Sequence, residues 1–239
     1  EGNQNYLSSK NPILNIFNTD KTARLFTLED TSWDPNILRP AYIFSLQEFH
    51  DLFSAESISS ELKLELGMQT VLFTDIVGSS SLYEEHGDSK TFLKVKKHFE
   101  EINKFVKENE GAIIKTIGDA VMAAFPSPLG AILAAISMLE TFDGVNMNGI
   151  RLRVSIHYGQ CIAVNLNSGI DFFGKTVNIA AKIQKLAGAS QIVFTKEFKE
   201  NPDVEQFLES NTIILEEVKY EIPGMRDTFT IYRINADKN

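Results

Sequence analysis

The sequence predicts an α+β fold arranged as an α/β sandwich. Short apolar runs of strand length alternate with longer stretches in which an apolar residue recurs every three or four positions, which is the period of a helix. Between residues 69 and 160 their order is strand, helix, strand, strand, helix, strand. Only the tight turn Ile117-Gly118-Asp119 separates the two middle strands. This order predicts a ferredoxin-like βαββαβ core and not a doubly wound parallel sheet.

Each element of this core has its own pattern. The first strand, residues 69–76, contains the buried run Val71-Leu72-Phe73. A long helix over about residues 89–110 is expected to end at Gly111. Its apolar face comprises Phe92, Val95, Phe99, Ile102 and Val106. The remaining core elements are strands at 112–116 and 120–125, an Ala- and Leu-rich helix at 128–142, and a strand at 151–160.

Additional strands and a helix follow the core. After a further strand we expect a helix over 176–186, a strand over 191–195, and two closing strands near 212–219 and 228–234.

The chain divides into an N-terminal extension, residues 1–66, and a main domain, residues 67–239. The extension is expected to hold a hairpin over 12–32, a helix cap at Asp34-Pro35 and a linker near 54–68. Between the cap and the linker, an amphipathic helix presents one apolar face, which we expect to pack on this domain or on a second copy. That face comprises Tyr42, Leu46, Phe49 and Phe53.

Composition excludes several classes of function. The net charge of -9 and the pI near 5.0 argue against a nucleic-acid groove or a polybasic membrane surface, because both need an excess of Lys and Arg. A phosphate-bearing substrate remains compatible, since bound metal ions can supply positive charge. The single cysteine, Cys161, excludes an internal disulfide and fits a reducing compartment, and its apolar setting predicts a buried side chain.

No membrane segment is expected, because no apolar stretch reaches the roughly 18 residues that span a bilayer. The chain begins with Glu instead of Met. We therefore expect a piece of a longer polypeptide with an upstream regulatory region. It would lie in the cytoplasm, or form the cytoplasmic part of a protein with a membrane anchor.

Two carboxylates are predicted to meet at one end of the sheet. The first and third strands of a ferredoxin-like unit are antiparallel neighbours, so Asp75 at the end of the first lies beside Asp119 before the third. Oxygen ligands of this kind suit Mg²⁺ or Mn²⁺, and two such ions about 4 Å apart can clamp a phosphoryl transfer. A single Asp after a strand is more often a turn residue. The pair favours a metal site.

A phosphate-binding turn follows Asp75. Gly78 and Ser79 lead into a helix whose free N–H groups can hold phosphates. Gly-Ser turns are common, so this pattern carries weight only together with the Asp pair.

Three blocks resemble the motifs of class III adenylyl and guanylyl cyclases. They are residues 73–79 (FTDIVGS), 114–120 (IKTIGDA) and 171–181 (DFFGKTVNIAA), which occur in the order and at the spacing of that family. The similarity covers about residues 68–235 and implies a palm-like cyclase domain. The segment before residue 54 is more loosely similar to the extension that precedes this domain in some bacterial members.

The resemblance implies an adenylate cyclase that converts ATP to 3′,5′-cyclic AMP and pyrophosphate. Asp75 and Asp119 would ligate two Mg²⁺ or Mn²⁺ ions per site, with the Ile76 carbonyl as a further ligand. Lys115 would donate to adenine N1, and Asp171 would accept from the 6-amino group. Guanine has a carbonyl at this position and would mispair. Guanylyl members typically carry Glu and a small polar residue or Cys at these two places.

The remaining implied roles concern the ribose and the phosphates. Asn178 would position the ribose. Four residues later the family usually has an Arg that stabilises the transition state, whereas this chain has Lys182, which keeps the charge but loses the two-point fork. We expect weakened turnover. Arg226 lies where members often place a cation for the terminal phosphates, although a solvated Arg at a strand end is an equal alternative. His157 is expected to be a packed residue and not a general base.

In family members one protomer supplies the metal-binding Asp pair and the other supplies the purine, ribose and transition-state residues. A homodimer with two sites and an inactive monomer are therefore implied. Two alternatives stay open: a guanylate cyclase, which Lys115 and Asp171 disfavour, and a degenerate nucleotide-binding regulatory domain with little turnover, which only Lys182 supports. A diguanylate cyclase is disfavoured, because its Gly-Gly-Asp/Glu-Glu-Phe loop does not occur.

Overall fold

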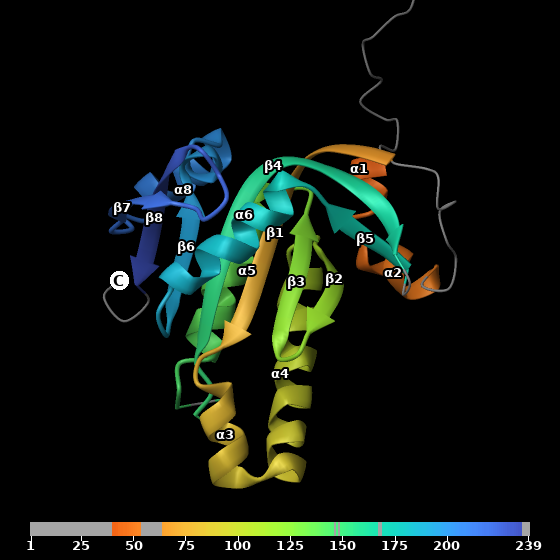
Figure 1. Cartoon of the computed structure of the whole chain (residues 1–239), viewed down its shortest axis with the longest axis vertical. Helices are drawn as coiled ribbons and strands as arrows, with labels where there is room; N and C mark the ends of the chain where they lie inside the picture. The colour runs from red at the N-terminus through yellow and green to blue at the C-terminus, as the bar shows by residue number, and fades with distance from the viewer. Residues whose placement is uncertain (1–39, 54–63, 146, 148, 167–168, 236–239) are drawn as a thin grey trace, which may run out of the picture. The chain divides into compact units, whose positions relative to one another are not determined.

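The computed structural model describes residues 40–53, 64–145, 147, 149–166 and 169–235 (Figure 1). The hairpin expected over 12–32 and the cap at Asp34-Pro35 lie outside the described residues. Residues 38–239 form one compact unit, so the short helices before the first strand belong to the same unit as the sheet.

An eight-stranded sheet is the centre of this unit. Its strand order is β2-β3-β1-β4-β6-β8-β7, and β5 pairs with β4 outside this path. The order β2-β3-β1-β4, with every neighbour antiparallel, confirms the ferredoxin-like core. The strands are β1 (Leu64–Ile76), β2 (Ala112–Ile117), β3 (Ala120–Phe125), β4 (Leu152–Leu166), β5 (Gly169–Phe173), β6 (Gln191–Thr195), β7 (Glu216–Glu221) and β8 (Thr228–Asn235).

Helices cover both faces of the sheet. In Figure 1, α5 lies behind the sheet and α6 lies in front of it. The helices are α1 (Pro40–Ile43), α2 (Gln47–Leu52), α3 (Ser79–His86), α4 (Asp88–Glu108), α5 (Pro128–Thr141), α6 (Lys175–Ile183), α7 (Lys196–Lys199) and α8 (Pro202–Ser210), with a 3₁₀ turn at Gln184–Leu186. None of the described helices is long and apolar enough to cross a membrane.

The central strand β1 has both faces in the core. Leu72 and Ile76 pack in the cluster that includes α4 and α5, whereas Val71 and Phe73 pack in a second cluster on the opposite face. Alternate side chains of a strand point to opposite faces. Burial on both sides therefore explains why this strand is a continuous apolar run.

The boundaries of β1 and α4 differ in part from the expectation. β1 begins at Leu64, so residues 64–68 belong to the sheet and not to a linker. On the expected face of α4, Val95, Ile102 and Val106 are buried. Phe99 is half-buried, and Phe92 is 64% exposed. Figure 1 shows the reason: the first turns of α4 extend beyond the β2–β3 hairpin, where no sheet covers them.

The end of α4 also corrects the expectation for Gly111. The left-handed position after the helix is occupied by Glu110, with φ 59°, and not by Gly111. Gly111 is buried, and a Cβ there would lie 2.5 Å from the Phe125 ring. The residue is small because the strand packs against it and not because the turn requires it.

The amphipathic segment over 42–53 forms two short helices instead of one. Leu46, between α1 and α2, has extended backbone with φ -89° and ψ 123°. Phe44 is buried in the cluster of Val71 and Phe73, while the next residue, Ser45, donates from Oγ to Gln69 Oε1 at 2.9 Å. The extended backbone at Leu46 therefore separates the two helices.

Two elements near the C-terminus were not expected. Helices α7 and α8 lie between β6 and β7, and Asn201 caps α8 by accepting a bond from the Asp203 N–H at 3.2 Å, with Pro202 at the first position. The Asn-Pro pair is a start signal that the sequence contains. Strand β7 begins at Glu216, four residues after the expected start at Thr212, which has φ 54°.

Candidate active site

The antiparallel ladders bring Asp75 and Asp119 to the same end of the sheet. The last pair between β1 and β3 joins Thr74 to Val121. Asp75 lies one residue beyond that pair on β1, and Asp119 lies two residues beyond it, in the turn that leads into β3. Ile76 follows Asp75 and pairs with Leu152 on the other side. Both residues therefore lie at the same end of the sheet, and their joint use as metal ligands stays a prediction.

Arg153 is a charged neighbour of Asp75 that the sequence analysis missed. It lies directly opposite Asp75 in the β1–β4 ladder, and both Nε and Nη2 of Arg153 donate to Asp75 Oδ2, the Nε bond at 2.7 Å. Both bonds use one oxygen, which leaves Oδ1 for another ligand. The sequence signal was weak, because Arg153 takes a regular polar position between Leu152 and Val154 in the alternation of β4.

Asp119 has the unsatisfied oxygen that a metal site requires. Its Oδ2 atom is buried and has no hydrogen-bond partner. A buried carboxylate oxygen without a partner is costly, and binding of a divalent cation would remove that cost. Asp75, Asp119 and the Ile76 carbonyl are oxygen donors of the type that Mg²⁺ and Mn²⁺ prefer. The residues at this end of the sheet therefore fit the implied metal ions.

The turn after β1 has the backbone that a phosphate site would use. Gly78 precedes α3 with φ 73°, a conformation that side chains other than glycine rarely adopt. No side chain caps the first turn of α3, which begins at Ser79. The Ser81 N–H donates to the Gly78 carbonyl at 3.0 Å, and the N–H groups before it in this turn are those that an anion could use.

A β-bulge in β2 decides where Lys115 points. Ile113 pairs with Ala123, and Lys115 pairs with Met122, so Ile114 is an extra residue between two successive pairs. Without this insertion Lys115 would oppose Val121, which faces the α4–α5 side of the core. With it, Lys115 opposes Met122 and faces the opposite side, which also carries α6 and β5. Bulges near functional sites commonly redirect a side chain in this way.

The redirected Lys115 meets Asp171. Lys115 Nζ donates to Asp171 Oδ2 at 2.5 Å, although 56 residues separate the two in sequence. The other oxygen of Asp171, Oδ1, accepts from the N–H of Phe172 at 2.8 Å, which fixes the carboxylate. The Asp171 side chain is 14% exposed and that of Lys115 is 37% exposed, so the pair lies at the surface of the site. The predicted purine-reading residues are thus side by side.

Asn178 and Lys182 lie one turn apart on α6. The buried side of this helix contains Ile179 and Ala180, whose carbonyl accepts from Ser155 Oγ at 2.8 Å. Asn178 is exposed, and its Nδ2 donates to the Gly174 carbonyl at 3.2 Å. Neither it nor Lys182 forms a hydrogen bond or ion pair with Asp75 or Asp119 in the described part of the chain.

The β7–β8 turn holds Lys182 and lies beside α6. Lys182 Nζ donates to the Pro223 carbonyl at 2.7 Å, and Lys175 forms an ion pair with Asp227 at 3.8 Å. Arg226 lies between these two attachments and is exposed. The structure therefore brings the two predicted phosphate cations, Lys182 and Arg226, to one turn.

Comparison with known proteins identifies the fold and the family. The family described as "Adenylate and Guanylate cyclase catalytic domain" matches residues 64–236, more than half of the chain. The chain belongs to this family.

Curated relatives of this cyclase domain are longer proteins. It is 27% identical over 164 residues to an adenylate cyclase of Mycosarcoma maydis, covering 59% of this chain and 6% of that protein. It is 24% identical over 209 residues to the receptor-type adenylate cyclase GRESAG 4.1 of Trypanosoma brucei brucei, covering 70% of this chain and 17% of that protein. The chain thus spans less than a fifth of either relative.

Solved structures with this cyclase fold include enzymes of both specificities. An adenylate cyclase from Trypanosoma brucei in its monomeric state superimposes with a TM-score of 0.63 at 22% identity, covering 72% of this chain and 91% of that one. The adenylyl cyclase CyaB from P. aeruginosa gives 0.63 at 20% identity, covering 72% and 95%. The guanylyl cyclase Cya2 gives 0.62 at 17% identity, covering 70% and 91%. These likenesses establish the fold.

Two histidines near the cyclase site are buried as neutral rings. Burial lowers the pKa of His98 and of His157 to about 4. The His98 ring packs against Phe142, its two nitrogens have no hydrogen-bond partner, and the nearby Asp119 carboxylate only partly offsets the loss of solvent. His157 Nδ1 is 2.7 Å from Thr195 Oγ1, which confirms His157 as a packed residue.

Cys161 is also inert by position. It is 3% exposed, and burial raises the pKa of its thiol to about 11. A thiol with so little thiolate at neutral pH is not a nucleophile.

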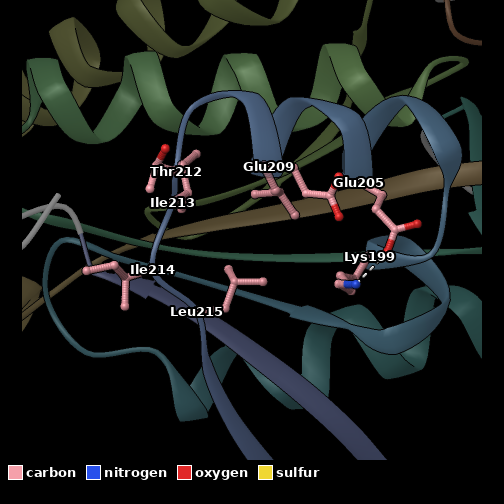
Figure 2. A pocket seen from close by; sticks show the side chains of 8 residues that line it. Lys199, Glu205, Glu209, Thr212, Ile213, Ile214 and Leu215 are labelled. Atoms are coloured by element: carbon pink, nitrogen blue, oxygen red, sulfur yellow. Dashed lines mark hydrogen bonds and ion pairs between the residues drawn. The ribbon is translucent and has the colours of Figure 1, made fainter.

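One hollow on the cyclase domain lies away from the site residues. Figure 2 shows it between α8 and the segment that follows, with Lys199 paired to Glu205 at one side. None of the predicted metal, purine or phosphate residues lines it.

We predict that the free energy of unfolding falls as the pH is lowered from 7 to 4. Each buried histidine has a pKa of about 4 when folded and about 6.5 when unfolded, so the unfolded chain takes up the proton first. As the pH falls from about 6.5 to about 4, each ring lowers the free energy of unfolding by up to about 3 kcal/mol. In urea unfolding series at pH 7, 6, 5 and 4, His98→Phe should be as stable as wild type or more stable at pH 7 and lose less stability towards pH 4. An unchanged pH dependence in this variant would contradict the assignment.

Proposed function

We propose that this chain is the catalytic domain of an adenylate cyclase, which converts ATP to 3′,5′-cyclic AMP and pyrophosphate. The observation that supports this best is the Lys115–Asp171 pair, with Nζ and Oδ2 at 2.5 Å. An ammonium donor beside a carboxylate acceptor matches adenine, which has an acceptor at N1 and a donor at the 6-amino group. Guanine reverses both, because it has a donor at N1 and a carbonyl at position six. A site built to bond one pattern discriminates strongly against the other.

Asp75, Asp119 and the Ile76 carbonyl would hold two divalent cations, Mg²⁺ or Mn²⁺. Class III cyclase domains generally use divalent metals, and the unsatisfied Asp119 Oδ2 supports the same use here. Bound ions of this kind lower the pKa of the attacking hydroxyl and offset phosphate charge. Arg153 holds the second oxygen of Asp75 and so orients its carboxylate.

The reaction forms a bond between the ribose O3′ and the α-phosphorus and breaks the bond from that phosphorus to the oxygen of the β-phosphate. The hydroxyl proton leaves to solvent. Asn178 would position the ribose, Lys182 would stabilise the added charge on the α-phosphate, and Arg226 would bind the terminal phosphates. The N–H groups at Gly78 and Ser79 would hold the phosphate chain from the other side. Lys182 Nζ has three donors, and its bond to the Pro223 carbonyl uses one of them.

We further propose that the active form is a homodimer with two equivalent sites. Asn178 and Lys182 lie on the side of α6 opposite to its buried residues, and Lys182 bonds to the β7–β8 turn. Each chain would offer its Asp pair to one site and its purine and ribose residues to the other. By analogy with receptor-type adenylate cyclases among the relatives, upstream regulatory regions would act on such a dimer at the cytoplasmic side of a membrane.

We predict that the purified protein with Mn²⁺ makes cyclic AMP from ATP and little cyclic GMP from GTP, as measured by mass spectrometry of the products. Asp75→Ala should abolish product, because it removes a carboxylate from the metal site. Glu140→Ala, which removes an exposed carboxylate of α5, is the matched control. Cyclic GMP as the main product would refute the purine assignment. Full activity of Asp75→Ala would refute the metal assignment.

We predict that two inactive variants restore each other. Asp75→Ala and Asn178→Ala damage different halves of the shared site, so a mixed dimer keeps one intact site. After unfolding and refolding an equal mixture, activity should recover to about a quarter of wild type, because half of the dimers are mixed and each has one of two sites. The same mixture without refolding serves as the control. Absence of recovery, with dimers present by sedimentation, would place both residues in one chain's site.

We predict that Lys182→Arg raises kcat. A guanidinium offers two parallel donors to a phosphate, whereas an ammonium acts as a point charge. Lys182→Ala should lower kcat by about 10²-fold, the usual effect of removing one such contact. Steady-state kinetics with saturating ATP and Mn²⁺ measure both. A lower kcat for Lys182→Arg than for wild type would show that the lysine is the adapted residue.

A further inference from the structure

The bulge that directs Lys115 lies in a strand with an open edge. Strand β2 is the last strand of the described sheet on its side, so β3 is its only partner in the ladder. Ile114 is the extra residue, and Ile113 and Lys115 flank it. A bulge disrupts the ladder locally, and its geometry depends on what satisfies the freed backbone groups. On an edge strand β3 cannot do this for the groups that point outward.

Gln47 satisfies the backbone at this bulge. The N–H of Ile113 donates to Gln47 Oε1 at 2.7 Å. Gln47 is the first residue of α2, 66 residues earlier in the sequence, and it is only 8% exposed. This short hydrogen bond, which a nearly buried side-chain amide accepts, therefore connects the N-terminal helices to Ile113, the residue just before the bulge.

The orientation of the Gln47 amide is itself determined. Its Nε2 donates to Asp51 Oδ1 at 2.9 Å, and the second oxygen of Asp51 accepts from Lys107 Nζ of α4 at 3.0 Å. The bond from Gln47 and the pair with Lys107 lower the pKa of the Asp51 carboxyl, so it stays an acceptor near neutral pH. Because Asp51 can only accept, Nε2 must face it and Oε1 must face Ile113.

We propose that Gln47 is a positioning residue for purine recognition: its amide holds the backbone of β2 at the bulge and so keeps Lys115 directed at Asp171 and at the base. Loss of this bond lets the bulge relax, and the Lys115 ammonium then no longer matches adenine N1. The inference rests on the proposed function, because it assigns to Gln47 the support of the purine-reading pair. It makes the segment over 40–53 part of the specificity of the site.

The test uses variants that separate this bond from general packing. Gln47→Leu keeps a side chain of similar size and removes both bonds. The double variant Gln47→Glu with Asp51→Asn restores the pattern in reverse, since Glu accepts from both the Ile113 N–H and the Asn amide. Ser45→Ala is the matched control. It also removes a buried bond between this segment and the sheet, but the partner is Gln69 of β1 and not β2.

The measurement is binding of 3′-deoxy-ATP and 3′-deoxy-GTP, which lack the attacking hydroxyl and cannot be turned over. Isothermal titration with Mn²⁺ gives the Kd of each for the full chain. Gln47→Leu should raise the Kd of 3′-deoxy-ATP by about tenfold, which is the effect of one well-placed hydrogen bond. The Kd of 3′-deoxy-GTP should change far less. With ATP, KM should rise more than kcat falls. Hydrogen exchange at the Ile113 amide should speed up in Gln47→Leu and not in Ser45→Ala.

The possible outcomes distinguish the two proposals. If wild type prefers 3′-deoxy-ATP, and Gln47→Leu keeps that preference while folded, the role of Gln47 is overturned and the adenylate cyclase assignment stands. Failure of a stably folded double variant to restore the preference also overturns it. If wild type binds both analogues equally, or neither, the purine assignment fails and the role of Gln47 fails with it. Restored preference in the double variant, with Ser45→Ala like wild type, supports the proposal.

Discussion

The register of the buried strand β1 is the constraint on which the site depends. Both faces of β1 lie in the core, so a slip by one residue would exchange Leu72 and Phe73 between two different apolar clusters. The ladders to β3 and β4 are therefore tightly specified. They place Asp119 on one side of Asp75 and Arg153 on the other. Apolar packing several residues away on β1 therefore determines which charged residues lie together at this end of the sheet.

The proposed purine-reading pair, Lys115 and Asp171, depends on a local exception to this regular sheet. Regular pairing of β2 would turn Lys115 towards the α4–α5 core, where an ammonium would lose its solvation without compensation. The extra residue Ile114 turns it to the face where Asp171 can pair with it. The bulge disrupts the ladder of an edge strand, where no further strand of the described sheet can accept from the Ile113 N–H. Gln47 Oε1 accepts this hydrogen bond instead. In this proposal the N-terminal helices contribute to the geometry of the site through the backbone of β2, not through the side chains of Lys115 and Asp171.

Helix α6 adds a second set of residues with a different orientation. Its buried side packs on β1 and β4, which directs Asn178 and Lys182 outward, next to the β7–β8 turn. A single chain therefore carries the proposed metal ligands at the end of the sheet and the proposed ribose and phosphate residues on the outer side of α6. This separation gives a physical reason for a shared site between two chains. Lys182 is the weak point of that proposed site, because an ammonium lacks the two-point fork that a guanidinium offers to a phosphate.

The sequence alone predicted the order of the core elements and the position of Asp75 and Asp119 at one end of the sheet. Both follow from periodicity and from the connection rules of a ferredoxin-like unit, which are read locally. Lys115 and Asp171 were found through the resemblance of their motifs to class III cyclases. Tertiary structure alone decided the bulge at Ile114, the break between α1 and α2, and the partner of Arg153. It also placed Glu110 in the left-handed position after α4, and Gly111 against the Phe125 ring. Each of these features depends on contacts with residues that are distant in the sequence. A local sequence pattern does not tell where those residues lie in the fold.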